Sequence, residues 1–267
     1  MKCTCLIIVI VAISMFCLSP ITSAKENTDT FHVGYFLVKP HAMPDKNSKA
    51  EGAAVEYFKR IAEKMGLPMV RFSLFPINRL LMVLEQNRID MALLFAKDPG
   101  RSERFEYPAQ PFCNTRSCVA VRISNPLKTI QKVDDLLPFT IQVSASAHRS
   151  SFILDPRLKI EPLYGDDFAT RCIKKLRYGR VDACYQPDNF PIQFEAGKAQ
   201  NASLVRVLLL PEDPIGLFSV FSKQSTKSYL KKYEAALDQV KKEISYQEVF
   251  TNLINMNIQQ KSSAQDN

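Results

Sequence analysis

An unbroken apolar run, Met91–Phe95 (MALLF), limits the folds open to this chain. A strand that is apolar at every position has both faces covered, which is typical of a parallel sheet inside an α/β protein. Parallel strands need crossover connections, and these are usually helices. The run therefore predicts a sheet flanked by helices.

Strands and helices are predicted to alternate around this run. Residues 31–40 begin with a β-rich segment, and residues 53–65 repeat apolar side chains at helical spacing. Gly66 follows where a helix commonly ends in a left-handed residue. A second strand is predicted over residues 69–75 and a short helix over residues 76–87. This order indicates βαβ units.

A second α/β block begins near Val119, and no low-complexity linker separates it from the first. Two such blocks predict two lobes around a cleft, where α/β proteins bind ligands. The strands are expected to cross between the lobes near residues 112–118 and 209–214. The expected division is residues 27–114 with 212–258 in lobe 1, residues 115–211 in lobe 2, and a disordered tail over residues 259–267.

The first residues have the pattern of a secretory signal peptide. Lys2 precedes an apolar stretch over residues 6–18, and the small residues Thr22 and Ala24 suit a cut before Lys25. The stretch is short for an uncleaved membrane anchor. We therefore expect residues 1–24 to be removed and the protein to be exported to the periplasm.

Four cysteines remain after this cut, which suits an exported protein with two disulfides. Proximity in the sequence favours the pairs Cys113–Cys118 and Cys172–Cys184, although four buried thiols are the alternative. No CxxC motif is present, so neither a thiol redox site nor a zinc knuckle is indicated.

Charge and motifs exclude several functions. The net charge is +8, but basic residues are interleaved with acidic ones, as in KKYEAALDQVKKE, which is typical of a solvated helix face. Nucleic-acid binding is therefore not expected. GxSxG, HExxH, GxGxxG and P-loop motifs are absent, and the three histidines lie far apart. We expect no catalytic residue, metal or cofactor, and no enzymatic activity.

Two arginines follow the buried run in the segment KDPGRSERFEYPAQPF, residues 97–112. Arg101 comes after a turn at the carboxyl edge of the predicted sheet, where its planar fork suits a carboxylate. Arg104 is expected at the cleft rim or the surface. His148 lies in the small-residue turn SASAHRS and either lines the cleft or is exposed. Asp166 or Asp167 is interpreted as a helix cap.

The order of several motifs resembles extracellular solute-binding proteins of family 3, the polar amino-acid binders of bacterial ABC importers. The resemblance rests on EGAAVEYFKRIAEKMGLP, LLMVLEQNRIDMAL, DPGRSERFEYPAQPF, TIQVSASAHRS and CIKKLRYGRVDACYQPDN, in that order. It implies a two-lobed type II periplasmic binding fold, each lobe a mostly parallel sheet flanked by helices.

The resemblance also implies a binding site. Arg101 stands where the family grips a ligand carboxylate, and the turn that contributes further donors falls on Ser144, Ser146 and His148. The aspartate that binds the ligand's amino group is displaced, because CYQPDN puts Pro187 at that place and Asp188 one residue later. FPINR adds Arg79 as a supporting cation, and Tyr35 or Phe36 is expected to pack the apolar part of the ligand.

The resemblance implies a monomer without cofactor that delivers a small carboxylate-bearing solute, an amino acid or a related organic acid, to an ABC permease. Two alternatives remain open. One is a ligand sensor that acts on a membrane receptor or signalling partner. The other is a dehydratase-like enzyme on the same fold, which needs a positioned acid or base in the cleft, such as His148.

Overall fold

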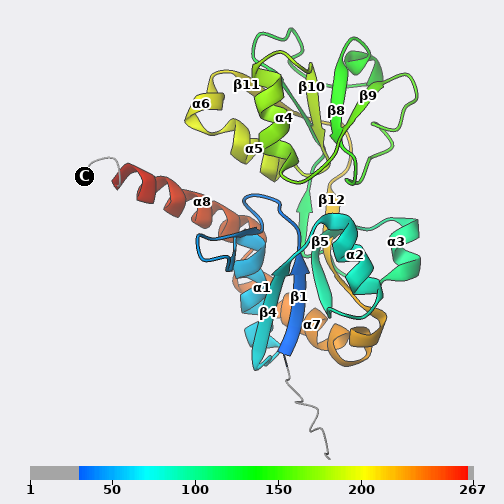
Figure 1. Ribbon diagram of the computed structural model, residues 1–267, viewed down its shortest axis with the longest axis vertical. Coiled ribbons are helices and arrows are strands. Elements are labelled where there is room, and N and C mark those ends of the chain that lie inside the picture. Colours follow the sequence, from blue (N-terminus) through cyan, green and yellow to red (C-terminus); the bar gives the residue numbers. More distant parts are fainter. Residues whose placement is uncertain (1–29, 264–267) are drawn as a thin grey trace, which may run out of the picture.

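The computed structural model describes residues 30–263 of the 267. The predicted signal peptide, residues 1–24, lies outside the described residues, as do residues 264–267 of the predicted tail. Figure 1 shows two α/β lobes, one above the other, linked by extended chain. This is the mixed α/β architecture that the sequence predicts.

The first lobe is built on a five-stranded sheet in the order β4-β1-β5-β12-β6. β1 pairs in parallel with β4 and β5, whereas β12 pairs antiparallel with β5 and β6. All six residues of β5 are buried, as the apolar run predicts. The strands are β1 (Thr30–Tyr35), β4 (Met69–Leu74), β5 (Met91–Ala96), β6 (Cys113–Thr115) and β12 (Ile215–Phe221).

Helices and a small ribbon surround this sheet (Figure 1). α1 packs against α7 and α8 and buries the apolar stripe predicted from its spacing. Gly66, just after α1, has φ of 66°, the left-handed conformation that glycine adopts most readily. The elements are β2 (Met43–Pro44), β3 (Ala50–Glu51), α1 (Ala53–Lys64), α2 (Ile77–Glu85), α3 (Pro99–Arg104), α7 (Lys223–Glu243) and α8 (Tyr246–Ser263).

The second lobe has its own five-stranded sheet in the order β11-β7-β10-β8-β9. β8 pairs in parallel with β9 and β10, and β7 pairs antiparallel with β10 and β11. The elements are β7 (Cys118–Arg122), η1 (Val133–Leu136), β8 (Thr140–Ser144), β9 (Lys159–Leu163), α4 (Phe168–Arg177), β10 (Ala183–Gln186), α5 (Asn189–Ala196), α6 (Ala199–Ala202) and β11 (Val205–Leu209).

Two chain crossings connect the lobes. The chain leaves the first sheet after Thr115 and enters the second at Cys118, then leaves the second sheet after Leu209 and re-enters the first at Ile215. Because both connections are short, a movement of one lobe against the other must occur through the dihedral angles of these few residues. Such short connections commonly form the hinge between two lobes.

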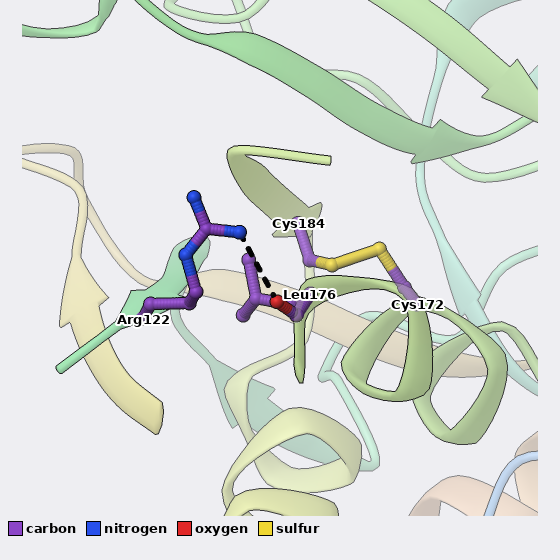
Figure 2. Close-up of a disulfide and its surroundings, with 4 residues drawn as sticks. All are labelled: Arg122, Cys172, Leu176 and Cys184. Atoms are coloured by element: carbon purple, nitrogen blue, oxygen red, sulfur yellow. Dashed lines mark hydrogen bonds between the residues drawn. A yellow bond between two sulfur atoms is a disulfide. The ribbon is translucent and has the colours of Figure 1, made fainter. Parts of the chain in front are cut away.

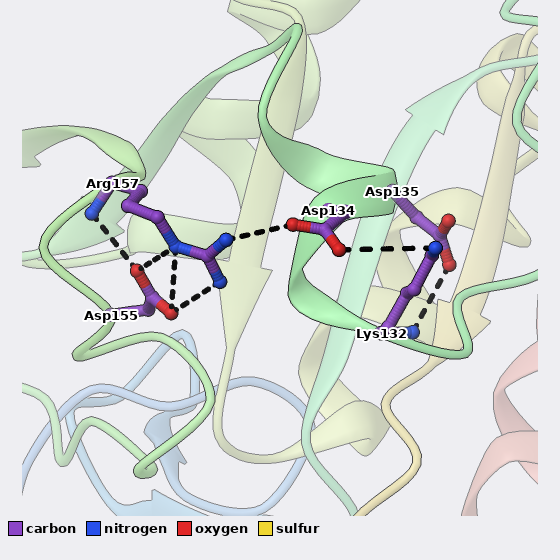
Figure 3. A network of polar contacts seen from close by, with 5 residues as sticks. All are labelled: Lys132, Asp134, Asp135, Asp155 and Arg157. Atoms are coloured by element: carbon purple, nitrogen blue, oxygen red, sulfur yellow. Dashed lines mark hydrogen bonds and ion pairs between the residues drawn. The ribbon is translucent and has the colours of Figure 1, made fainter.

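A polar network stiffens the loop between β8 and β9 (Figure 3). Nη1 of Arg157 lies 2.8 Å from the carboxylate of Asp134 in η1, and Nη2 lies 2.8 Å from the carboxylate of Asp155 in the same loop as Arg157. The Arg157 guanidinium lowers the pKa of Asp155 to about 2. Arg157 and Asp134 are exposed and Asp155 is partly exposed, so the network fixes the path of the loop more than it stabilises the lobe.

One predicted disulfide is present, between Cys172 on α4 and Cys184 on β10, with 6.1 Å between their Cα atoms. Figure 2 shows the bridge joining the helix to the strand beneath it. Near the end of α4, Arg122 of β7 donates a hydrogen bond of 3.4 Å to the Leu176 carbonyl. α4 is therefore held to the sheet at two points.

The predicted Cys113–Cys118 disulfide is wrong, because both cysteines are free thiols. They lie at the start of β6 and of β7, in different sheets. Five residues of extended chain span up to about 16 Å, whereas a disulfide needs Cα atoms about 4.4–6.8 Å apart. Burial raises the pKa of both thiols, so they are protonated and unreactive.

The segment predicted to be a disordered tail, residues 259–267, begins within α8, which runs to Ser263. Glutamine and lysine, which dominate Gln259–Lys261, are good helix formers and extend a helix already begun at Tyr246.

Among residues 30–263, no helix combines the length and apolar character needed to cross a membrane.

Reduction of Cys172–Cys184 should lower stability. The bridge closes a loop with a sequence separation of 12, which the chain-entropy relation converts to about 3 kcal/mol of unfolding free energy. A Cys172→Ala/Cys184→Ala variant should show that loss in urea unfolding, and wild type with reductant should match it. The control is a Cys113→Ala/Cys118→Ala variant, whose unfolding free energy should still fall when reductant is added. If reductant had no effect on that variant, the assignment of the disulfide to Cys172–Cys184 would be contradicted.

Candidate functional site

A cavity of about 260 Å³ lies between the two lobes. Its walls come mainly from segments that follow strands of both sheets. Since the carboxyl ends of parallel strands meet at one edge, each sheet presents these segments towards the other. The walls include residues 36–39 after β1, 76–78 at the start of α2, 94–96 of β5, Arg101, 144 and 146–148 at and after the end of β8, 163–169 before and at the start of α4, and 186–188 at and after the end of β10.

Arg101 is the cation fixed most firmly in the first-lobe wall. Its Nε lies 3.1 Å from the Asp98 carboxylate, and its Nη1 donates a hydrogen bond of 3.2 Å to the Ala96 carbonyl. The guanidinium carbon lies 5.3 Å from the centre of the Phe95 ring. Within residues 30–263, Nη2 has no partner, so it is available to an anion in the cavity.

The short helix α3 places Arg101 there. Asp98 is its N-cap and accepts a hydrogen bond of 3.0 Å from the Arg101 backbone N–H, and Pro99 occupies the first turn, where proline suits a helix. Arg104, one turn later, lies 2.5 Å from Glu85 and is exposed. The sequence analysis expected it at the rim or the surface, and the structure places it at the surface.

Ser144, Ser146 and His148 line the opposite wall, which belongs to the second lobe. Ser144 ends β8, and the other two follow in the turn after it. In the described part of the chain, the hydroxyl groups of both serines make no hydrogen bond. Two hydroxyl donors therefore lie across the cavity from Arg101 without a protein partner.

His148 is neutral near pH 7. Burial lowers the pKa of its imidazole, and the positive charge of Arg101 lowers it further, while Asp98 and Glu212 act in the opposite direction. His148 and Arg101 line the same cavity, although they belong to different lobes.

The two aromatic residues predicted to pack against a ligand lie in different surroundings. Phe36 lines the cavity, whereas Tyr35 is 2% exposed and belongs to the core of the first lobe. Successive residues of an extended chain point to opposite sides, so the two cannot share one surface. Phe36 lies 5.6 Å from Phe95, measured between ring centres, which fixes it beside the Arg101 platform.

Arg79 is exposed and is not among the residues that line the cavity. Its neighbours Ile77 and Asn78, in the first turn of α2, do line it. The next residue, Leu80, is fully buried in the first lobe. Because each residue along a helix is rotated from the one before, this placement of Leu80 turns Arg79 to solvent.

Asp188 lines the cavity but its carboxylate is engaged elsewhere. One oxygen accepts hydrogen bonds from the Thr115 hydroxyl at 2.6 Å and the Phe190 backbone N–H at 3.0 Å. The other lies 2.9 Å from Nε2 of His41, at ion-pair distance although the angle is not that of a hydrogen bond. Asp188 is 6% exposed.

These partners make Asp188 the centre of a buried interlobe network. His41 belongs to the first lobe, Thr115 to the crossing at β6, and Asp188 to the second lobe. The Nδ1 atom of His41 shares a short hydrogen bond with the Tyr246 hydroxyl of α8. Phe190 of α5 packs on Phe250 of α8 at 4.5 Å between ring centres. The lobes are therefore tied beside the hinge.

A second interlobe contact spans the cavity itself. Nζ of Lys39, after β1, lies 2.9 Å from the carboxylate of Asp167, before α4. Asp167 also accepts a hydrogen bond of 2.8 Å from the Thr170 hydroxyl. Asp167 is the N-cap residue of α4, one of the two positions predicted, but its side chain forms no cap hydrogen bond with the helix backbone. The sequence held no sign of this pair, whose members are 128 residues apart.

Leu94 lines the cavity in a strained conformation. Its φ is 67°, which is uncommon for a residue other than glycine, and it lies within β5. The adjacent ladder shifts register between Phe218 and Val220 of β12. A left-handed leucine costs roughly 1–2 kcal/mol. Such strain persists where the surroundings enforce it, and it is concentrated at functional sites.

No metal site accompanies these groups. Throughout residues 30–263, no three histidine, cysteine, aspartate or glutamate side chains are placed to hold a metal ion together.

The chain belongs to the bacterial extracellular solute-binding proteins, family 3, whose pattern it matches over residues 35–255. No curated protein matches its sequence.

Solved structures share its fold. An ancestral arginine-binding protein bound to arginine is 22% identical with a TM-score of 0.69, and the match covers 84% of this chain and 97% of that one. The GluR0 ligand-binding core from Nostoc punctiforme with L-glutamate is 16% identical with a TM-score of 0.67 and coverages of 83% and 98%. AncCDT-1, an ancestral amino-acid-binding protein and precursor of cyclohexadienyl dehydratase, is 20% identical with a TM-score of 0.69 and coverages of 84% and 94%.

Removal of the Lys39–Asp167 ion pair should favour the open arrangement. A partly exposed pair contributes up to about 1 kcal/mol, so Lys39→Met should lower the closed-to-open ratio by up to about fivefold. Small-angle X-ray scattering should then give a larger radius of gyration for the unliganded variant. Lys59→Met is the control, because its pair with Glu56 lies within α1. Identical scattering from Lys39→Met and wild type would contradict a closing role.

Stability should fall in acid partly through His148. Its pKa in the folded protein lies below the model-compound value of 6.5, so the unfolded chain binds more protons between these values. The contribution of neutral His148 to the free energy of unfolding is therefore complete above about pH 6.5. It is lost as the pH falls towards the lower pKa of the folded state. Urea unfolding at about pH 7.5 and about pH 5.5 should show a smaller acid loss for His148→Gln than for wild type. Burial also lowers the pKa of His32, which is present in both proteins and therefore contributes the same acid loss of stability to each. An equal loss would contradict the desolvation of His148.

Proposed function

We propose that the protein captures a small carboxylate-bearing solute in the interlobe cavity and delivers it to the permease of an ABC importer. One observation carries the proposal: the unpartnered Nη2 of Arg101 lies in one wall, and the free hydroxyl groups of Ser144 and Ser146 lie in the other. A carboxylate has two oxygens and so can accept hydrogen bonds from both walls at once.

Ligand binding would work through the equilibrium between open and closed lobes. A carboxylate that accepts from Arg101 and from the serines gains its full set of hydrogen bonds only when both walls are near. It therefore binds the closed form better and shifts the population towards it. Closure also removes water from the site, which strengthens each charged hydrogen bond.

We place the protein in the periplasm. This placement rests on the signal-peptide pattern of residues 1–24 and on the Cys172–Cys184 disulfide, which suits an oxidising compartment. The family consists of extracellular solute-binding proteins. Arginine and glutamate, the ligands bound in two of the similar structures, each carry a carboxylate.

We propose binding without turnover. General acid–base catalysis needs a group held in position for proton transfer. Among the residues of the cavity walls, Asp188 and Asp167 are already hydrogen-bonded and ion-paired. His148 is the remaining titratable candidate, and no residue in the described part of the chain orients its ring through a hydrogen bond.

An Arg101→Gln variant should lose the ligand. Loss of one partner of a desolvated charge pair costs about 2–5 kcal/mol, so affinity should fall at least about 30-fold. The measurement is thermal stabilisation by amino acids, hydroxy acids and dicarboxylates, followed by titration calorimetry with each acid that stabilises. Arg79→Gln is the matched control, because Arg79 is exposed and lies outside the cavity walls, and its affinity should equal that of wild type.

Two results would contradict the proposal. One is undiminished affinity in Arg101→Gln. The other is consumption of the bound acid, followed by mass spectrometry, because consumption would indicate an enzyme.

A further inference from the structure

We propose that the ligand carries no ammonium group beside its carboxylate, and that the cavity selects an organic acid whose remaining polar group is neutral, such as a 2-hydroxy acid. The inference rests on the proposed function, because it assigns a chemical class to the solute that Arg101 holds. The evidence for it is that the acidic side chains around the cavity either have protein partners or are exposed to solvent.

Asp188, the most buried acid of the walls, already has partners at both carboxylate oxygens. One oxygen accepts hydrogen bonds from Thr115 at 2.6 Å and from the Phe190 backbone N–H at 3.0 Å, and the other lies 2.9 Å from Nε2 of His41. These contacts include the interlobe network beside the hinge. An ammonium at Asp188 would therefore share the carboxylate with groups that are themselves buried and would compete with their contacts.

The other acids are also engaged or solvated. Asp167 pairs with Lys39 and accepts from Thr170. Asp98 pairs with Arg101 and caps α3, and it is not among the residues of the cavity walls. Asp166 lines the cavity but is exposed, so solvent screens its charge. Within residues 30–263, no buried carboxylate of the cavity walls is without protein partners.

A neutral donor fits the cavity better than a cation. The Oε1 atom of Gln186, at the end of β10, is buried and has no hydrogen-bond partner in the described part of the chain, and Gln186 lines the cavity. A ligand hydroxyl would satisfy this oxygen without bringing a charge. An ammonium would satisfy it too, but would lose its hydration beside a carboxylate whose oxygens already have other partners.

The rest of the wall suits an apolar body. Phe36, Leu94 and Phe168 line the cavity together with Pro187, which stands directly before Asp188. Pro187 offers no side-chain acceptor. The expected ligand therefore has a carboxylate at Arg101, a hydroxyl near Gln186 and a hydrocarbon or aromatic body between the lobes.

Two pairs of nearly isosteric probes test this inference. L-Phenylalanine is compared with L-3-phenyllactate, and L-leucine with L-2-hydroxy-4-methylpentanoate, by titration calorimetry near neutral pH. Within each pair the ligands differ only by ammonium and hydroxyl. The hydroxy acid of at least one pair should bind at least about tenfold more tightly than its amino acid.

A single substitution should reverse the preference. Gln186→Glu keeps the side-chain shape and puts a negative charge where the unpartnered oxygen lies. The ratio of amino-acid to hydroxy-acid affinity should rise at least about tenfold relative to wild type. Gln193→Glu is the matched control, because Gln193 is exposed on α5, and it should leave the ratio unchanged.

The outcomes separate the inference from the proposed function. Tighter binding of the hydroxy acids, lost in Arg101→Gln, supports both. Tighter binding of the amino acids, also lost in Arg101→Gln, overturns the inference and leaves the carboxylate site standing. Binding that does not depend on Arg101, or binding of none of the four acids, overturns the inference together with the site on which it rests.

Discussion

The buried carboxylate of Asp188 is the group on which the arrangement of the cleft depends. It caps α5, accepts from Thr115 at the strand crossing and lies 2.9 Å from His41 of the other lobe. A buried carboxylate is tolerated only with such partners. Asp188 ties the lobes beside the hinge and lines the cavity with both of its oxygens in contact with protein groups. The proposed selectivity of the site thus depends on the same contacts that connect the lobes.

The two sheets bring the remaining groups together. Their carboxyl edges face each other, so Arg101 after β5 and Ser144 at the end of β8 lie across one cavity although they come from different lobes. Side-chain contacts hold parts of both walls in place. Asp98 and the Ala96 carbonyl fix the guanidinium, and the Arg157 network holds the loop that continues from Ser144 (Figure 3). Closure can therefore proceed at the crossings while the walls keep their shape.

The sequence predicts the fold well, because the buried run of β5 and the helical spacing of α1 are local patterns. The place of Arg101 in the cavity wall was also predictable, since it comes a short turn after a buried strand. The Lys39–Asp167 pair was not, because its members meet only after both lobes fold. The engagement of Asp188 by His41 depends on the same assembly. The left-handed Leu94 has no local signature, and the Cys113–Cys118 prediction failed because proximity in the sequence ignored the extended crossing between the cysteines.

A crystal structure with a bound 2-hydroxy acid tests the central claim most directly. The carboxylate should lie within hydrogen-bonding distance of Nη2 of Arg101 and of at least one of the Ser144 and Ser146 hydroxyl groups. Asp188 should remain in contact with His41 and Thr115. A ligand bound away from Arg101, or an Asp188 that has left its partners to contact the ligand, would contradict it.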